Sequence, residues 1–158
     1  MAAGAALSLG IIALVLGGSP SLCDQIDRLV HESETRFESI IVAPIARSPG
    51  DWTTSFAVGG SDECTISLDP ERAGYLCSWE FDQGDDGSAL YEQHTNSVRS
   101  CVGEQVLERL DALVNHPDFF ESTYFTESNH EISVSLKNKN ELQKVFVSIG
   151  VDGFTATG

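Results

Sequence analysis

Residues 64–81 read CTISLDPERAGYLCSWEF, and this stretch decides the fold. Apolar and polar residues alternate on both sides of the tetrapeptide DPER at 69–72, as they do in half-buried strands. Its proline has a φ close to the value that the second position of a type I turn requires, so the tetrapeptide predicts a turn between two antiparallel strands. If the turn centres on its two middle residues, Ile66 lies opposite Tyr75 and both strands share one apolar face.

The same register places Cys64 opposite Cys77. Two cysteines at facing positions of an antiparallel pair lie close enough for a disulfide. We therefore predict a Cys64–Cys77 disulfide, which leaves Cys23 and Cys101 as the second pair. Gly74 keeps an alternative open, because a glycine bulge at this position would shift the pairing of the strands.

The residues before the hairpin predict one helix and one strand. Asp24 precedes apolar residues at helical spacing that continue to Ile41, and its carboxylate suits a helix N-cap. Pro44 ends this helix. The alternating run from Trp52 to Val58 then predicts a strand ahead of the two strands of the hairpin.

The second half of the chain repeats this order. Ser88 precedes apolar residues at helical spacing that reach Val102, and a second helical stripe at 106–114 continues until Pro117. Three alternating strands separated by polar connections are predicted after it, at 120–126, 131–137 and 144–151.

These elements predict an α+β fold in the order α-β-β-β-α-β-β-β, with an antiparallel sheet covered by helices on one face. Polar side chains alternate with the apolar ones and so belong to the opposite face of the sheet. They are Thr65, Ser67, Ser78, Ser133, Ser135, Lys137 and Ser148. Residues 22–158 are expected to form a single domain, because the chain is too short for two ordinary enzyme domains.

The first 21 residues carry a predicted signal peptide. The uncharged apolar run at 5–16 is too short to span a bilayer but has the length of a signal-peptide hydrophobic region, and small residues suit cleavage after Ser21. Cys23 leaves lipidation as an alternative, although Leu22 is bulkier than the residue expected before a lipidated cysteine. The segment has no Lys or Arg, which leaves a misassigned start or an uncleaved anchor open.

The cysteines and the signal peptide point to the same compartment. An even number of cysteines in a small exported domain indicates disulfides, which form in oxidising compartments. No Asn-X-Ser/Thr sequon occurs, so N-glycosylation gives no support for a eukaryotic secretory origin. We expect a periplasmic or secreted protein with no membrane span in its mature chain.

The charge of the chain limits its partners. It has 24 Asp+Glu against 9 Lys+Arg, a formal net charge of −15. Nucleic-acid binding needs clustered cations that displace counterions from phosphates, so we expect no nucleic-acid partner. The acidic surface either serves solubility or attracts a protein partner with a basic surface.

Two short motifs resemble known functional sites only in part. The loop at 82–87 matches an EF-hand calcium loop at its first, fifth and sixth positions. The third ligand position is Gly84 and the position of the closing glutamate is Gln93, so we expect a solvated loop. The tripeptide HPD at 116–118 resembles that of J-domain co-chaperones over these three residues alone, without the basic helix that precedes it there.

The histidines offer the only other candidates for chemistry. No two of His31, His94, His116 and His130 have a spacing that places both on one helix face. We expect no metal site, no cofactor and no catalytic residues. The alternative is a small periplasmic hydrolase or ligand-binding domain in which His94 or His116 and nearby acids line a cleft.

An aromatic cluster suggests a surface for partners. Phe119, Phe120, Tyr124 and Phe125 are four aromatic residues within seven positions, and on a strand they would point to both faces of the sheet. The outer pair would form an apolar docking patch, unless a helix covers the second face as well. We therefore expect an exported, non-enzymatic protein that binds another macromolecule, such as an inhibitor, an immunity factor or an envelope accessory factor.

Overall fold

The computed structural model describes residues 20–83, 87–103, 106–115, 118–127 and 129–154. The expected signal peptide, 1–21, lies outside the described residues except for its last two positions. In the described part of the chain, no helix has the length and apolar character needed to cross a membrane.

Each half of the chain consists of a helix followed by four strands. In the first half the elements are α1 (Leu22–Glu34), β1 (Ile41–Pro44), β2 (Asp51–Thr54), β3 (Glu63–Leu68) and β4 (Arg72–Asp82). In the second half they are α2 (Gly87–Cys101), β5 (Leu107–Asn115), β6 (Asp118–Glu127), β7 (His130–Lys139), a short 3-10 helix (Asn140–Leu142) and β8 (Lys144–Phe154).

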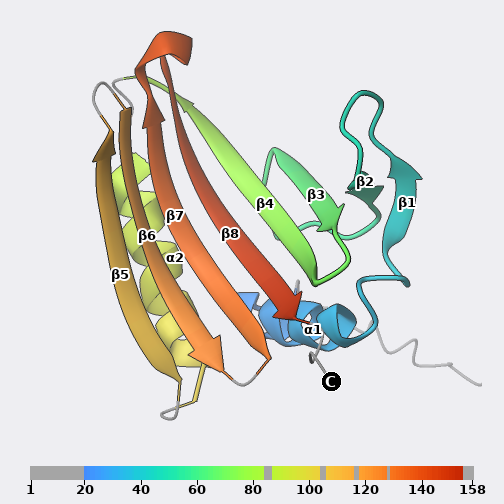
Figure 1. Ribbon diagram of the computed structural model, residues 1–158. Helices are drawn as coiled ribbons and strands as arrows, with labels where there is room; N and C mark the ends of the chain where they lie inside the picture. The colour runs from blue at the N-terminus through green and yellow to red at the C-terminus, as the bar shows by residue number, and fades with distance from the viewer. Residues whose placement is uncertain (1–19, 84–86, 104–105, 116–117, 128, 155–158) are drawn as a thin grey trace, which may run out of the picture.

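All eight strands form one antiparallel sheet in the order β1-β2-β3-β4-β8-β7-β6-β5 (Figure 1). Strands β4 and β8, the last of each half, pair in the middle of the sheet from Arg72 opposite Phe154 to Asp82 opposite Lys144. A continuous ladder of backbone hydrogen bonds therefore joins the two halves. The antiparallel α+β prediction is confirmed, but the sheet has eight strands where the sequence predicted six.

The β3–β4 hairpin has the predicted register. Cys64 lies opposite Cys77, and Ile66 lies opposite Tyr75. The two cysteines form a disulfide with their Cα atoms 4.1 Å apart. Pairing continues without interruption to the end of β3, so Gly74 introduces no bulge.

The second predicted disulfide is also present. Cys23 near the start of α1 is bonded to Cys101 at the end of α2, across a sequence separation of 78 residues. All four cysteines are therefore paired. The Cys23–Cys101 disulfide fixes the helix of the first half to the helix of the second.

Helix α2 packs against one face of the sheet, behind β5, β6 and β7 in Figure 1. The rings of His94 on α2 and Trp79 on β4 lie 4.5 Å apart. The Tyr91 hydroxyl on α2 lies 3.0 Å from the Thr123 hydroxyl on β6. Buried side chains on this face of the central strands complete the core: Tyr75, Cys77, Ile132, Val134, Leu136, Val145, Val147, Ile149 and Val151.

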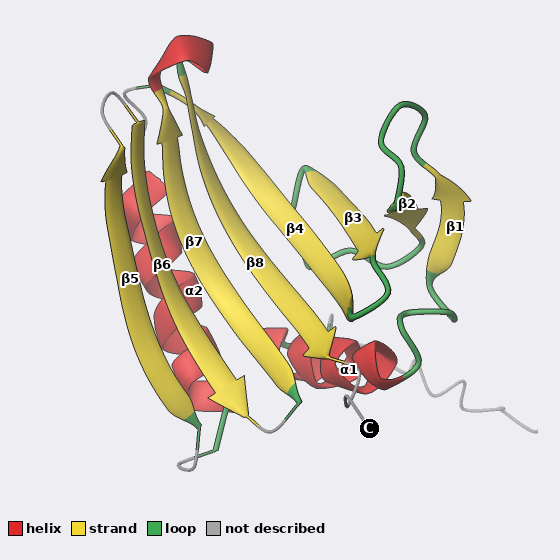
Figure 2. Cartoon of the chain, in the orientation of Figure 1, coloured by secondary structure: helices red, strands yellow, loops and turns green. Residues whose placement is uncertain are grey.

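Helix α1 lies at the C-terminal end of β8 (Figure 2). The contact is close, because a Cβ atom added to Gly153 of β8 would lie 2.9 Å from the Cβ atom of Ser33. Ile26 and Leu29 of α1 are buried in the same core. Glycine at this position therefore lets the helix approach the strand.

Helix α1 differs from the prediction at both ends. The N-cap is Ser21, whose hydroxyl accepts a hydrogen bond from the Asp24 backbone N–H, while the Asp24 carboxylate accepts one from the Ser21 N–H. Asp24 is thus the third residue of a capping box, and its assignment as N-cap is wrong. The helix ends at Glu34, because Arg36 and Phe37 have φ angles of +56° and +60°, outside the right-handed helical region.

The helical stripe predicted at 106–114 is wrong, because residues 107–115 form strand β5. This strand pairs with β6 along its whole length, which satisfies backbone groups on an otherwise open edge of the sheet. Leu107 and Leu110 remain 69% and 63% exposed, so the apolar residues of this run do not all face the core. Pairing with β6 has therefore determined the structure of residues 107–115, against the helical spacing of their apolar residues.

The first predicted strand, 52–58, is shorter than expected. Strand β2 ends at Thr54, and an additional short strand, β1, pairs with it at the edge of the sheet. Phe56 and Val58 follow β2 and pack against the core outside any strand.

We expect replacement of both Cys23 and Cys101 by alanine to lower the free energy of unfolding by about 4 kcal/mol. A cross-link across 78 residues removes roughly that much chain entropy from the unfolded state. Urea denaturation measures the difference. Ser100→Ala, an exposed change on the last turn of α2, is the control and should alter the value by less than about 0.5 kcal/mol. A loss below about 1 kcal/mol in the double variant would contradict this role for the disulfide.

Candidate functional site

Four serines form one row across the sheet. Ser78 on β4, Ser148 on β8 and Ser135 on β7 lie directly opposite one another, and Ser122 continues the row on β6. The hydroxyls of the last two are hydrogen-bonded to each other. Because Trp79 points to α2, its strand neighbour Ser78 points the other way. We call this side, opposite α2, the open face.

The open face has the polar side chains that the sequence predicted for it. Each of them is exposed or half-buried, in contrast to their buried strand neighbours. They are Thr65, Ser67, Ser78, Ser133, Ser135, Lys137 and Ser148.

Large side chains flank the serine row on both sides. Phe146 on β8, Lys137 on β7 and Phe120 on β6 form the adjacent row. On the other side of the serines, Leu76 on β4 and Tyr124 on β6 belong to one row, with only a glycine and a serine between them. A floor of small side chains between larger ones makes a depression across the central strands.

This depression is a groove of about 480 Å³, which we call the open-face groove. The residues that line it come from β4, β6, β7, β8 and the 3-10 helix: Leu76, Ser78, Phe120, Ser135, Lys137, Lys139, Leu142, Phe146 and Ser148. Its exposed lining is mainly apolar, with Leu76 46% and Leu142 61% exposed. This volume and the mainly apolar lining fall within the range found in ligand-binding pockets.

All three lysines of the chain lie at one end of the open-face groove. Lys137 and Lys139 line it, and Lys144 stands at the start of β8 beside it. The Lys144 ammonium lies 2.6 Å from Asp82 and 3.0 Å from Glu80. Hydrogen bonds to these two carboxylates raise the pKa of Lys144, and the ammonium lowers the pKa of Asp82.

A second depression of about 330 Å³ lies further along the same face, between β3, β4, β7 and β8. Asp51 and Asp152 line it together with Arg72, whose Nε atom is 3.9 Å from the Asp152 carboxylate. Burial raises the pKa of Asp152 in spite of this arginine. A Cβ atom at Gly74 would collide with the same carboxylate, so glycine makes room for it. This depression is more polar than the open-face groove.

The structure separates the aromatic residues that the sequence grouped as a partner-binding patch. Phe120 and Tyr124 point to the open face, where the Arg109 guanidinium stacks 4.2 Å from the centroid of the Tyr124 ring. Phe125 is buried on the face toward α2. The side chain of Phe119 lies outside the described residues.

A cleft of about 370 Å³ lies between α2 and strands β5 and β6. Arg99 of α2 forms two hydrogen bonds with the Glu108 carboxylate, at 2.8 and 2.5 Å. This pair lowers the pKa of Glu108 and satisfies both charges. Glu121 also lines the cleft, and no described histidine does.

None of the three histidines that the structure describes lines any of these depressions. His94 is buried against Trp79, and its Nε2 atom has no hydrogen-bond partner within the part of the chain that the structure describes. Burial lowers its pKa. His31 and His130 each lie near one glutamate on their own element or turn, and His116 is outside the described residues.

No metal site emerges from the described residues. Within them, no group of three or more His, Cys, Asp or Glu side chains is arranged to hold a metal ion. The loop considered for calcium, 82–87, lies partly outside the described residues, because 84–86 are not among them.

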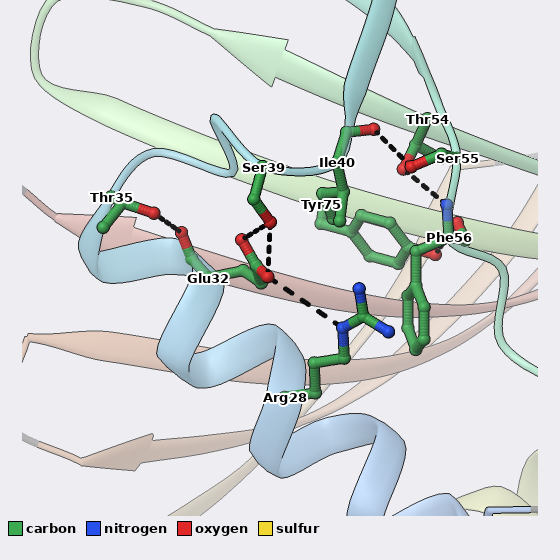
Figure 3. Close-up of polar contacts among 9 residues, drawn as sticks. All are labelled: Arg28, Glu32, Thr35, Ser39, Ile40, Thr54, Ser55, Phe56 and Tyr75. Atoms are coloured by element: carbon green, nitrogen blue, oxygen red, sulfur yellow. Dashed lines mark hydrogen bonds and ion pairs between the residues drawn. The ribbon is translucent and has the colours of Figure 1, made fainter.

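A set of contacts around Arg28 is structural (Figure 3). The Arg28 guanidinium lies 4.4 Å from the centre of the Phe56 ring and 3.9 Å from Glu32. Ser39 donates to the same glutamate at 2.6 Å, and the buried Tyr75 hydroxyl donates to the Phe56 carbonyl at 2.9 Å. These contacts hold α1 to the turn after it and to the segment after β2.

Comparison with known proteins identifies no relative. No family model matches the chain, and searches of the curated proteins and of the solved structures gave no significant match. A function proposed for this protein therefore rests on its own residues.

We expect His94→Phe to raise the free energy of unfolding at pH 5 by about 1 kcal/mol. Phenylalanine keeps a ring against Trp79 and removes a buried polar atom that lacks a partner. Burial lowers the pKa of His94 in the folded protein, whereas the unfolded chain keeps the ordinary value of 6.5. As the pH falls below 6.5, the unfolded chain therefore binds a proton that the folded protein does not, and stability is lost. The His94→Phe variant should not show this loss of stability, because phenylalanine does not titrate.

Urea denaturation at pH 5 and pH 8 checks the effect, with a larger gain at pH 5. The control is His31→Gln, because His31 is exposed on α1 and its replacement should change the free energy of unfolding by less than about 0.5 kcal/mol. A lower stability of His94→Phe at pH 5 would contradict the assignment of His94 as a neutral core residue.

Proposed function

We propose that this protein is an exported binding protein that holds another protein on the open face of its sheet. The observation that carries this proposal is the open-face groove of about 480 Å³, an exposed and mainly apolar depression on a face that α2 does not occupy. Exposed apolar surface bordered by polar residues is typical of protein interaction sites.

The arrangement of the helices supports this proposal. The described side chains that contact α1 and α2 belong to the face with Trp79, Val147 and Gly153, and the serine row belongs to the other. We infer that the helices cover one face of the sheet alone, so that the other stays accessible. A sheet with one solvated face is common in antiparallel folds.

The cysteines support export. All four are oxidised, one pair inside a hairpin and the other between the two helices. Disulfides of this kind persist in the periplasm or outside the cell and are rare in a reducing cytosol. This agrees with the apolar segment at 5–16, which has the length of a signal-peptide core.

Binding is favoured over hydrolysis by the chemistry of the surfaces. The open-face groove is lined by lysines, serines and apolar side chains, and the described residues place no histidine in it. His94, the described histidine of the alternative hydrolase hypothesis, packs in the core against Trp79. An inhibitor, an immunity factor or an envelope accessory factor would need only the binding surface.

Site-specific photocrosslinking in the source organism tests the proposal. We expect full-length chains with the photoreactive residue p-benzoylphenylalanine in place of Leu76 or Phe146 to form a crosslinked protein adduct, because both side chains line the groove. Mass spectrometry identifies the adduct. The matched control carries the same residue in place of Glu92, an exposed position on α2, and should not form this adduct.

Thermal unfolding of each purified variant shows whether it has kept the fold. If the folded Leu76 and Phe146 variants form no adduct, or if the adduct forms from position 92 alone, the open face is not the binding surface.

A further inference from the structure

We propose that the open-face groove receives a segment of the partner in which an aromatic side chain stands next to a carboxylate. This inference rests on the proposed function and names the chemistry of the partner. The aromatic ring would lie among Leu76, Phe146 and Leu142, and the carboxylate would meet Lys137 at the end of the groove.

The first argument is the placement of positive charge. The chain has 24 Asp+Glu, and none of those that the structure describes is among the residues that line the groove, whereas Lys137 and Lys139 are. All three lysines of the chain fall within 137–144. On a protein of net charge −15, this places every lysine beside one groove, and Glu80 and Asp82 offset the charge of one of them, Lys144.

The second argument is that Lys137 differs from Lys144. Lys144 is neutralised by Glu80 and Asp82 at 3.0 and 2.6 Å. Lys137 is exposed and has no ion-pair partner among the residues that the structure describes. Its ammonium is thus available to a carboxylate that comes from outside the chain.

The third argument is the combination of apolar walls and a hydroxyl floor. Leu76 and Phe146 present apolar surface on opposite sides of Ser148 and its neighbours in the serine row. Their area suits an aromatic ring, which buries much apolar surface at low entropic cost. The serine hydroxyls can exchange hydrogen bonds with the backbone of an entering segment.

The remaining acidic surface adds selectivity. At physiological salt, charges are screened beyond about 8 Å, so an acidic segment senses the lysines near the groove more strongly than distant carboxylates. Elsewhere on the surface it meets mainly repulsion. A neutral or basic segment would gain nothing from Lys137, so the charge complementarity selects an acidic one.

The test compares two probes that differ in charge alone, N-acetyl-tryptophan with its free carboxylate and N-acetyl-tryptophanamide. The ¹⁵N-labelled protein, purified after export, is titrated with each probe at low salt, and backbone amide shifts are followed by NMR. We expect both probes to shift the amides of groove residues, and the carboxylate probe to bind about two- to five-fold more tightly, as one exposed ion pair allows.

Three variants of the protein sharpen the result. Lys137→Gln should abolish the difference between the probes and leave the affinity for the amide unchanged. Arg47→Gln removes one positive charge at the far edge of the sheet and should preserve the difference. Ser148→Phe should fill the floor of the groove and weaken both probes at least five-fold.

The outcomes separate this inference from the proposed function. If both probes bind equally to the groove, or if Lys137→Gln has no effect, the acidic chemistry is wrong while the groove remains a binding site. If neither probe shifts groove amides, the inference is overturned, and photocrosslinking decides the proposed function independently. If sedimentation shows a dimer whose formation shifts the same amides, the occupant is a second copy of this chain and the inference is wrong.

Discussion

The antiparallel ladder between β4 and β8 is the interaction on which the rest of the structure depends. Each half of the chain ends in its longest central strand, and these two strands pair along their full length. Without this ladder the molecule would be two small sheets, each with a long hydrophobic strand exposed at its edge. With it, the buried residues Cys77, Val147 and Ile149 lie in the interior of a single core, and the serine row crosses the join between the halves.

The β3–β4 hairpin and both disulfides could be predicted from the sequence, because strand periodicity and turn chemistry are local. The β5 strand could not. Its apolar residues fit a helical period nearly as well as a strand, and only the free edge of β6 decides between them. The end of α1 was missed for a similar reason, since Arg36 and Phe37 adopt a left-handed backbone conformation without a glycine to signal it.

The candidate site was predictable only in fragments. Serines at alternate positions indicated an outer face, but the four clustered aromatics were not divided between the faces, and only the pairing of β6 with β7 places Phe120 and Tyr124 on the same one. Their assembly into a groove depends on the register between β4, β8 and β7, which brings together residues up to about seventy positions apart in the sequence. Long-range register follows from the whole core and has no local signature. The positive charge at the groove was missed for the same reason, because only the register between the strands places the lysines next to the apolar side chains that line the groove.

The connectivity of the disulfides has a consequence for how the protein matures. The pairs are nested, with Cys64–Cys77 enclosed between Cys23 and Cys101. If the chain crosses a membrane amino end first, Cys23 reaches the oxidising side well before its partner, and Cys64 is the first thiol available to it. An oxidase that joins cysteines in order of emergence would then trap the wrong bridge, which only thiol–disulfide exchange can undo. Efficient maturation would thus need a disulfide isomerase, or early formation of the Cys64–Cys77 hairpin, so that Cys64 is no longer available to react with Cys23.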